Sequence, residues 1–180
     1  MGGVYPPQVL GVKNMDNIIL IGMPGSGKST VGVVLAKAAG MGFVDGDLLI
    51  QQQEGALLQQ LIDSRGVEEF LDIEGRVLSS LSCSRSVIAP GGSCVCRADA
   101  MEHLRSLGTV VYLKLSFEEI CSRIHNLDSR GIALQPGQTL RDVYDFRTPL
   151  YEAYAHLTVE TGGLSLAEAV SAVRHALDGR

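Results

Sequence analysis

The chain has 180 residues, of which 46% are hydrophobic and 19% are charged, and its formal net charge is −5. This length and composition predict one compact domain with a sizeable core. A negative net charge without a cluster of Lys and Arg argues against a nucleic-acid binder, and the apolar runs are too short to span a membrane. The cysteines at positions 83, 94, 96 and 121 are typical of reduced thiols, which favours a cytoplasmic location.

Short apolar runs alternate with helical segments along the chain. We expect an N-terminal extension over residues 1–16 and a single domain over residues 17–180. The predicted strands are Ile18–Ile21, Gly42–Val44, Ser86–Pro90, Thr109–Leu115 and Leu157–Val159. Three of the later helices begin at sequences that resemble capping boxes, Ser116–Glu119, Thr139–Asp142 and Ser165–Glu168. This order predicts an α/β three-layer sandwich, with a five-stranded parallel sheet flanked by helices.

The first predicted strand leads into the motif Gly22–Ser29, which fits the phosphate-loop pattern G-x-x-x-x-G-K-[ST]. A helix is predicted directly after it, and strand, loop and helix is the order that the motif requires. Backbone N–H groups of such a loop surround phosphate oxygens, and the helix N-terminus adds the positive end of its dipole. We therefore predict binding of a nucleoside triphosphate through Gly25, Ser26, Gly27, Lys28, Ser29 and Thr30. Within this set, Lys28 is expected to reach the β- and γ-phosphates, and Ser29 to ligate Mg²⁺.

Two acids, Asp45 and Asp47, follow the second predicted strand. The third and fourth strands end without an acid, so this pair is the candidate for the carboxylates that a kinase needs. The carboxyl end of a parallel strand opens into the crevice that holds the phosphate loop. We expect Asp47 to orient the acceptor hydroxyl and Asp45 to hold the metal through water. In the alternative interpretation, one of these acids only caps the following helix.

Two segments interrupt the alternation of strands and helices. Residues 48–81 form a long helical stretch that is broken near Ser64–Gly66, and residues 126–138 are polar and contain glycine. In a phosphate-loop kinase, insertions at these positions hold the acceptor and close over the phosphates. We therefore predict an acceptor-binding segment and a lid, although long surface segments also occur without such roles. Gly91 and Gly92, at the end of the third strand, either form a turn or let a ligand approach the backbone.

In this order the motifs resemble those of the shikimate kinase family. The resemblance extends over residues 17–161 and includes the phosphate loop, Asp45–Asp47, Phe70–Glu74 and Gly91–Ser93. It implies a nucleoside-monophosphate-kinase-like fold and the ATP- and Mg²⁺-dependent conversion of shikimate to shikimate 3-phosphate. ATP and a small acceptor are then the expected partners, and we expect a monomer.

The resemblance also implies roles for single residues. Arg130 corresponds to the lid arginine, which makes Lys28, Asp47 and Arg130 the expected catalytic residues. Arg123 corresponds in placement to an arginine that lies against the adenine. The expected acceptor-binding residues are Asp47, Leu71, Gly91, Gly92, Ser93 and Arg147.

Two positions differ from the pattern of the family. Leu71 stands where the family has an arginine that binds the carboxylate of the acceptor, and Ser93 replaces the last of three glycines. These differences keep open a kinase of the same fold that acts on another small hydroxy acid or polyol. An alternative of another class is a regulatory protein that binds ATP without catalysis, which the set Asp47, Arg130 and Arg147 disfavours.

Overall fold

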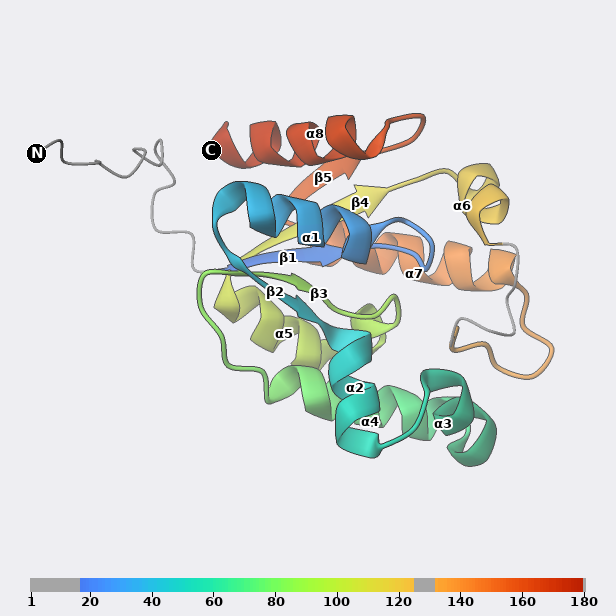
Figure 1. Ribbon diagram of the computed structural model, residues 1–180. Helices are drawn as coiled ribbons and strands as arrows, with labels where there is room; N and C mark the ends of the chain where they lie inside the picture. Colours follow the sequence, from blue (N-terminus) through green and yellow to red (C-terminus); the bar gives the residue numbers. More distant parts are fainter. Residues whose placement is uncertain (1–16, 125–131, 180) are drawn as a thin grey trace, which may run out of the picture.

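Five parallel strands form the centre of the protein, in the order β2-β3-β1-β4-β5 (Figure 1). The computed structural model describes residues 17–124 and 132–179. The strands are β1 (Asn17–Ile21), β2 (Gly42–Asp45), β3 (Ser86–Ala89), β4 (Thr109–Lys114) and β5 (Leu157–Glu160). All neighbouring strands pair in parallel. The five-stranded parallel sheet predicted from the sequence is confirmed.

Strand β1 lies in the middle of the sheet and is buried on both faces. Ile18 and Leu20 belong to the core on one side of the sheet, and Ile19 and Ile21 belong to the core on the other side. Alternate side chains of a strand point to opposite faces, so a strand with two cores needs apolar residues on both faces, as β1 has from Ile18 to Ile21. This explains why the sequence of β1 shows no polar alternation.

Helices cover both faces of the sheet and complete the predicted three-layer sandwich (Figure 1). Helices α1 (Lys28–Ala39) and α8 (Leu166–Asp178) pack side by side on the first face. The core on the second face receives side chains from α5 (Ala98–Leu107), α6 (Phe117–Arg123), α7 (Leu140–Tyr154) and the 3₁₀ turn η1 (Cys94–Cys96).

The predicted helical stretch over residues 48–81 consists of three helices with their own apolar cluster. They are α2 (Gly46–Glu54), α3 (Leu58–Arg65) and α4 (Val67–Ser79). The expected break near Ser64–Gly66 is present, but a second break was not predicted. It follows Gly55, whose φ of +67° ends α2 in a left-handed conformation that glycine adopts without strain.

The three capping boxes predicted from the sequence are confirmed. The side chains of Ser116, Thr139 and Ser165 accept hydrogen bonds from backbone N–H groups three residues later, at 3.2–3.3 Å. In each helix the acidic residue at that later position also accepts a hydrogen bond from the backbone N–H of the cap. These bonds satisfy N–H groups that the first helical turn leaves without partners, so the three helix starts are set locally.

Some predictions concern residues outside the described part of the chain. These are the N-terminal extension over residues 1–16, Arg130, and the first half of the predicted lid. In the second half of the lid, Ile132 and Ala133 are buried, and Gln135 donates a hydrogen bond to Glu68 of α4. Among the helices in the described part of the chain, none has both the length and the apolar character that a bilayer crossing requires.

Asn17, at the start of β1, connects three other segments through its buried side chain. Its Nδ2 donates to the carbonyl oxygens of Cys83, at 2.9 Å, and Leu107, at 3.0 Å. Its Oδ1 accepts a hydrogen bond from the backbone N–H of Ser86 at 3.0 Å. A single amide side chain therefore satisfies backbone groups before β3, in β3 and at the end of α5.

We predict that Asn17→Leu lowers the free energy of unfolding by about 3 kcal/mol or more. The leucine has a similar size but leaves two carbonyls and one N–H without partners, and each unpaired buried group costs about 1–3 kcal/mol. Urea denaturation of both proteins measures the difference. Gln52→Leu is the control, because Gln52 is exposed on α2; its effect should stay within about 0.5 kcal/mol. Equal effects of the two substitutions would contradict this account of Asn17.

Candidate active site

A cavity of about 490 Å³ opens at the carboxyl ends of β1, β2 and β3. β1 pairs with β3 on one side and with β4 on the other, so the chain leaves β1 at the position where the strand order reverses. Ligands of open parallel sheets bind at such a position. The lining residues are Pro24, Gly25, Gly27, Lys28, Ser29, Thr30, Asp47, Phe70, Pro90, Gly92, Ser93, Arg123, Ile132, Ala133 and Arg147.

One end of the cavity is formed by the loop between β1 and α1. Gly25 and Gly27 have φ values of +80° and +90°, which few residues other than glycine adopt without strain. Gly27 is the N-cap of α1, and no side chain bonds to the N–H groups of the first turn. The first backbone N–H groups of a helix have no partner within the helix. This loop and helix start can therefore donate hydrogen bonds to an anion.

Lys28 is almost fully buried, at 8% exposure, although it lines the cavity. Its Nζ donates hydrogen bonds to the carbonyl oxygens of Gly22 and Met23, both at 2.9 Å. Burial lowers the pKa of Lys28 below its ordinary value, and the nearby charge of Asp47 opposes that shift. An ammonium group has three donors, so one N–H remains for a ligand in the cavity.

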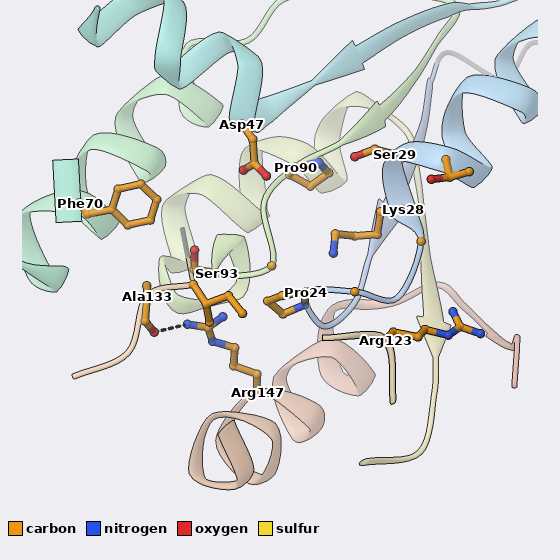
Figure 2. A pocket seen from close by; sticks show the side chains of 15 residues that line it. Pro24, Lys28, Ser29, Asp47, Phe70, Pro90, Ser93, Arg123, Ala133 and Arg147 are labelled. Atoms are coloured by element: carbon orange, nitrogen blue, oxygen red, sulfur yellow. Dashed lines mark hydrogen bonds between the residues drawn. The ribbon is translucent and has the colours of Figure 1, made fainter. Parts of the chain in front are cut away.

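The other end of the cavity brings together side chains from α2, from α4, from the residue before η1 and from α7 (Figure 2). Asp47, Phe70, Ser93 and Arg147 gather there, with Lys28 between them and the far end of the cavity. Burial raises the pKa of Asp47 above its ordinary value, and Lys28 opposes that shift. A carboxylate with a raised pKa is a better proton acceptor than an ordinary aspartate.

Arg147 is 3% exposed and reaches the cavity from the middle of α7. Its Nη2 donates to the carbonyl oxygen of Ala133 at 3.0 Å, the dashed line in Figure 2. Among the described residues no carboxylate forms an ion pair with Arg147. A guanidinium has five N–H donors, so most of them stay available to a planar anion such as a carboxylate.

A second cavity, of about 290 Å³, adjoins the phosphate loop on its outer side. It shares Gly27, Thr30 and Arg123 with the first cavity. Val31 and Leu166 supply apolar surface to it, and Arg123 supplies a planar cation. Such a lining suits a flat aromatic group, because guanidinium planes stack on aromatic faces.

The comparisons with known proteins agree with this arrangement. A family model described as shikimate kinase matches residues 24–178. A shikimate kinase of Pseudomonas paraeruginosa is 41% identical over 150 residues, which is 82% of this chain and 87% of that protein. The chain belongs to the shikimate kinase family. A relative from Methylococcus capsulatus with the same description is 35% identical over 170 residues, or 93% of this chain and 95% of the relative.

Solved structures of shikimate kinases share the fold of this family member. The enzyme of Acinetobacter baumannii, determined in complex with shikimate, has a TM-score of 0.82 and 33% identity, covering 92% of this chain and 94% of its own. The Aquifex aeolicus enzyme has a TM-score of 0.76 and 29% identity, covering 91% of this chain and 96% of its own. The five-stranded sheet flanked by helices is therefore the fold of the family.

Most of the site residues expected from the resemblance to shikimate kinases line one of the two cavities. Gly25, Gly27, Lys28, Ser29, Thr30, Asp47, Gly92, Ser93, Arg123 and Arg147 line the main cavity. Ser26 is buried and faces the second cavity. Asp45 caps α2, because its Oδ1 accepts a hydrogen bond from the N–H of Leu48 at 3.2 Å. Its predicted contact with a metal stays a prediction, and among the described residues no group of three or more His, Cys, Asp and Glu side chains is arranged around a metal position.

Leu71 and Gly91, two other family positions, do not line the main cavity. Leu71 is 7% exposed in the apolar cluster of α2, α3 and α4, and it lines a separate cavity of about 260 Å³ that also touches Arg147. Phe70, its neighbour on α4, reaches the main cavity instead. Successive residues of a helix point about 100° apart, which lets Phe70 and Leu71 face different cavities.

Sequence reasoning did not identify the contributions of Phe70, Ile132, Ala133 and Glu74. Phe70 and Glu74 belong to a motif that was recognised, but no role was assigned to them. Ile132 and Ala133 lie in the predicted lid, where no pattern marked them as buried. Glu74 is 1% exposed, and neither of its oxygens has a hydrogen-bond partner of good geometry in the described residues.

Because Gly91 has no side chain, two carboxyl groups have room close to its backbone. A Cβ on Gly91 would clash with Oε1 of Glu74 and would lie 2.8 Å from Oδ1 of Asp47. We predict that Gly91→Ala lowers the free energy of unfolding by about 1–3 kcal/mol, because overpacking forces both side chains to move. Urea denaturation measures the change. Gly179→Ala is the control, since the nearest atom to its new Cβ is 3.5 Å away. An unchanged stability of Gly91→Ala would show that this space is open.

Proposed function

We propose that this protein transfers the γ-phosphoryl group of ATP to a hydroxyl of shikimate. One observation carries the proposal. A single cavity is lined at one end by the phosphate loop and at the other by Asp47, a carboxylate with a raised pKa, and by the buried guanidinium of Arg147. Phosphoryl transfer needs the donor phosphate and the acceptor oxygen to be held together, with positive charge beside the phosphate. Membership of the shikimate kinase family supports shikimate as the acceptor.

The phosphate end of the cavity would hold ATP through the loop and the start of α1. Lys28 would give up contact with the carbonyls of Gly22 and Met23, or use its third N–H, to neutralise the transferred phosphoryl group. The adenosine would occupy the second cavity, with its base against Arg123. Arg130, assigned to the lid by resemblance, would contact the γ-phosphate as the lid closes.

The donor set at the start of α1 fits Mg²⁺. Ser29 is exposed at the cavity, and its hydroxyl is a hard oxygen ligand next to the expected phosphates. Mg²⁺ keeps several waters and takes few protein ligands when phosphates also bind it, so a single hydroxyl is sufficient from the protein. When bound, the ion would neutralise charge on the phosphate oxygens. Asp45 would reach it only through water, as the sequence predicts.

At the acceptor end, each side chain has a separate task. Asp47 would accept a hydrogen bond from the reacting hydroxyl and take its proton during transfer. Arg147 would bind the carboxylate of the acceptor with the donors that Ala133 leaves free. Phe70 and the backbone at Gly92 and Ser93 would shape the wall around the ring. We expect the enzyme to act as a cytoplasmic monomer.

A coupled assay of ADP release tests the substrate. Purified protein, Mg-ATP and one acceptor at a time are combined, with shikimate, gluconate and homoserine as the panel. We expect ADP release that depends on shikimate and exceeds that with the other acceptors. With leucine at position 71, Arg147 is the one described arginine that lines the acceptor end. Faster ADP release with another acid than with shikimate would show that the acceptor is not shikimate.

Lys28→Ala should abolish phosphoryl transfer while the fold stays intact. The ammonium stabilises charge that develops in the transition state, and no other described lysine lines the cavity. Turnover is measured by the coupled assay and the fold by circular dichroism. Lys37→Ala is the matched control, because Lys37 lies in the last turn of the same helix. Near-full turnover in Lys28→Ala would refute the assignment.

Asp47→Asn should lower turnover by roughly 10²-fold or more with little change in ATP affinity. The amide keeps the shape and the hydrogen bonding of the side chain but cannot take the proton. Steady-state kinetics give turnover, and titration with a fluorescent ATP analogue gives affinity. Asp63→Asn, on the surface of α3, controls for the loss of one charge. A fall in ATP affinity alone would make Asp47 a metal residue instead.

A further inference from the structure

Glu74 is the least satisfied charged side chain in the described part of the site. It is 1% exposed, and neither carboxyl oxygen has a hydrogen-bond partner of good geometry among the described residues. By contrast, the buried cations Lys28 and Arg147 each donate to backbone carbonyls. An ionised carboxylate without partners is costly in a protein interior, and neutralisation by a proton removes that cost.

The position of Glu74 beside Asp47 adds to this cost. A Cβ placed on Gly91 would be in close contact with both Oε1 of Glu74 and Oδ1 of Asp47, so the two carboxyl groups lie near each other. Two carboxylates that share a site cannot both ionise freely, so one of them holds a proton more strongly. Asp47 lines the cavity and lies near Lys28, whereas Glu74 lies beneath the surface. Glu74 is therefore the carboxyl group that keeps the proton.

The residue three positions before Glu74 explains why no cation pairs with it. Residues three apart on a helix lie on the same face, so Leu71 and Glu74 are neighbours on α4. A guanidinium at position 71 could reach Glu74, but leucine offers only apolar contact there. The charged groups that face Glu74 from other elements are Asp47 of α2, Lys28 of α1 and Arg147 of α7. Two thiols of η1, Cys94 and Cys96, also lie close to it.

Resting on the proposed function, we propose that Glu74 is a positioning residue that carries a proton in the resting site, and that this proton lets an anionic acceptor bind at Arg147. Burial raises the pKa of Glu74 to about 7, and the Ser93 hydroxyl beside it opposes the shift. Above that pH, Glu74 and Asp47 would both be negative close to the acceptor carboxylate. Binding of the acid therefore weakens as the pH rises through neutrality.

The first test follows thermal stability and needs no substrate. A carboxyl whose pKa is 4.5 when unfolded and about 7 when folded binds more protons in the folded state between these values. Stability from this group is present at low pH and is lost as the pH rises through 7. Glu74→Gln has no such loss. The Tm of this variant minus that of the wild type should therefore be about 5 °C higher at about pH 8 than at about pH 5. Glu69→Gln, on the exposed side of α4, should show no such gain.

The second test measures KM for shikimate against pH. In the wild type, KM should rise about tenfold between about pH 6 and about pH 8, while KM for Mg-ATP changes little. In Glu74→Gln, KM for shikimate should stay low and flat across this range. In Leu71→Arg, a paired and ionised Glu74 should also give a flat profile, and this variant decides the question if Glu74→Gln does not fold.

The two tests separate this inference from the proposed function. If shikimate is phosphorylated but Glu74→Gln keeps the wild-type pH profile of KM, the inference is wrong and the function stands. If Tm shows the proton on Glu74 but shikimate is not phosphorylated, the proposed acceptor is wrong and the proton on Glu74 stands. If the Tm difference between the wild type and Glu74→Gln does not change with pH, Glu74 does not carry the proton and the inference is wrong.

Discussion

Taking a lysine, an arginine or a glutamate out of water costs several kcal/mol per ion, and three such side chains are buried in or beside one cavity here. The two cations, Lys28 and Arg147, are each held by backbone carbonyls rather than by acids. No carboxylate among the described residues forms an ion pair with either cation, so their positive charge is available to an anionic ligand. The two apolar cores on either side of the sheet must offset the free-energy cost of burying these charges.

Local sequence patterns predicted the elements of this fold well. Capping boxes and strands buried on both faces depend on residues close together in the chain, and these predictions were confirmed. The break at Gly55 was not predicted, because a left-handed glycine inside a long helical pattern looks like a tolerated helical residue. Helix boundaries of this kind depend on how α2 and α3 pack, which no short pattern describes.

The site was predicted less evenly, and the difference has a physical cause. The phosphate loop is a local structure, so its spacing alone places Lys28 and Ser29 at the cavity. The acceptor end is assembled from helices distant in sequence, and there the orientation of each side chain decides its role. Phe70 and Leu71 are neighbours in the sequence, yet one faces the cavity and the other packs into an apolar cluster. A motif can give the positions of such residues but not the faces on which they lie.

The leucine at position 71 changes more than one contact. An arginine at position 71, as in the family, would both balance the negative charge of Glu74 and bind the acceptor. Leu71 instead extends the apolar cluster of α2, α3 and α4, which favours packing of these helices. Charge balance at the acceptor end then falls to Lys28, Arg147 and protons from solvent. The chemistry of this site is therefore coupled to solution pH in a way that a fixed ion pair would prevent.

The side chain of Asn17 has a consequence for the other end of its strand. In a strand with one polar face, a slip of one residue is prevented because it would expose apolar side chains. β1 is apolar on both faces, so a slipped β1 would still bury apolar residues on each side. The hydrogen bonds of Asn17 to Cys83, Leu107 and Ser86 distinguish the correct alignment from its neighbours. A slip would displace the phosphate loop by about 3.3 Å, so a polar residue at the start of β1 acts as the positional reference for the loop at its far end.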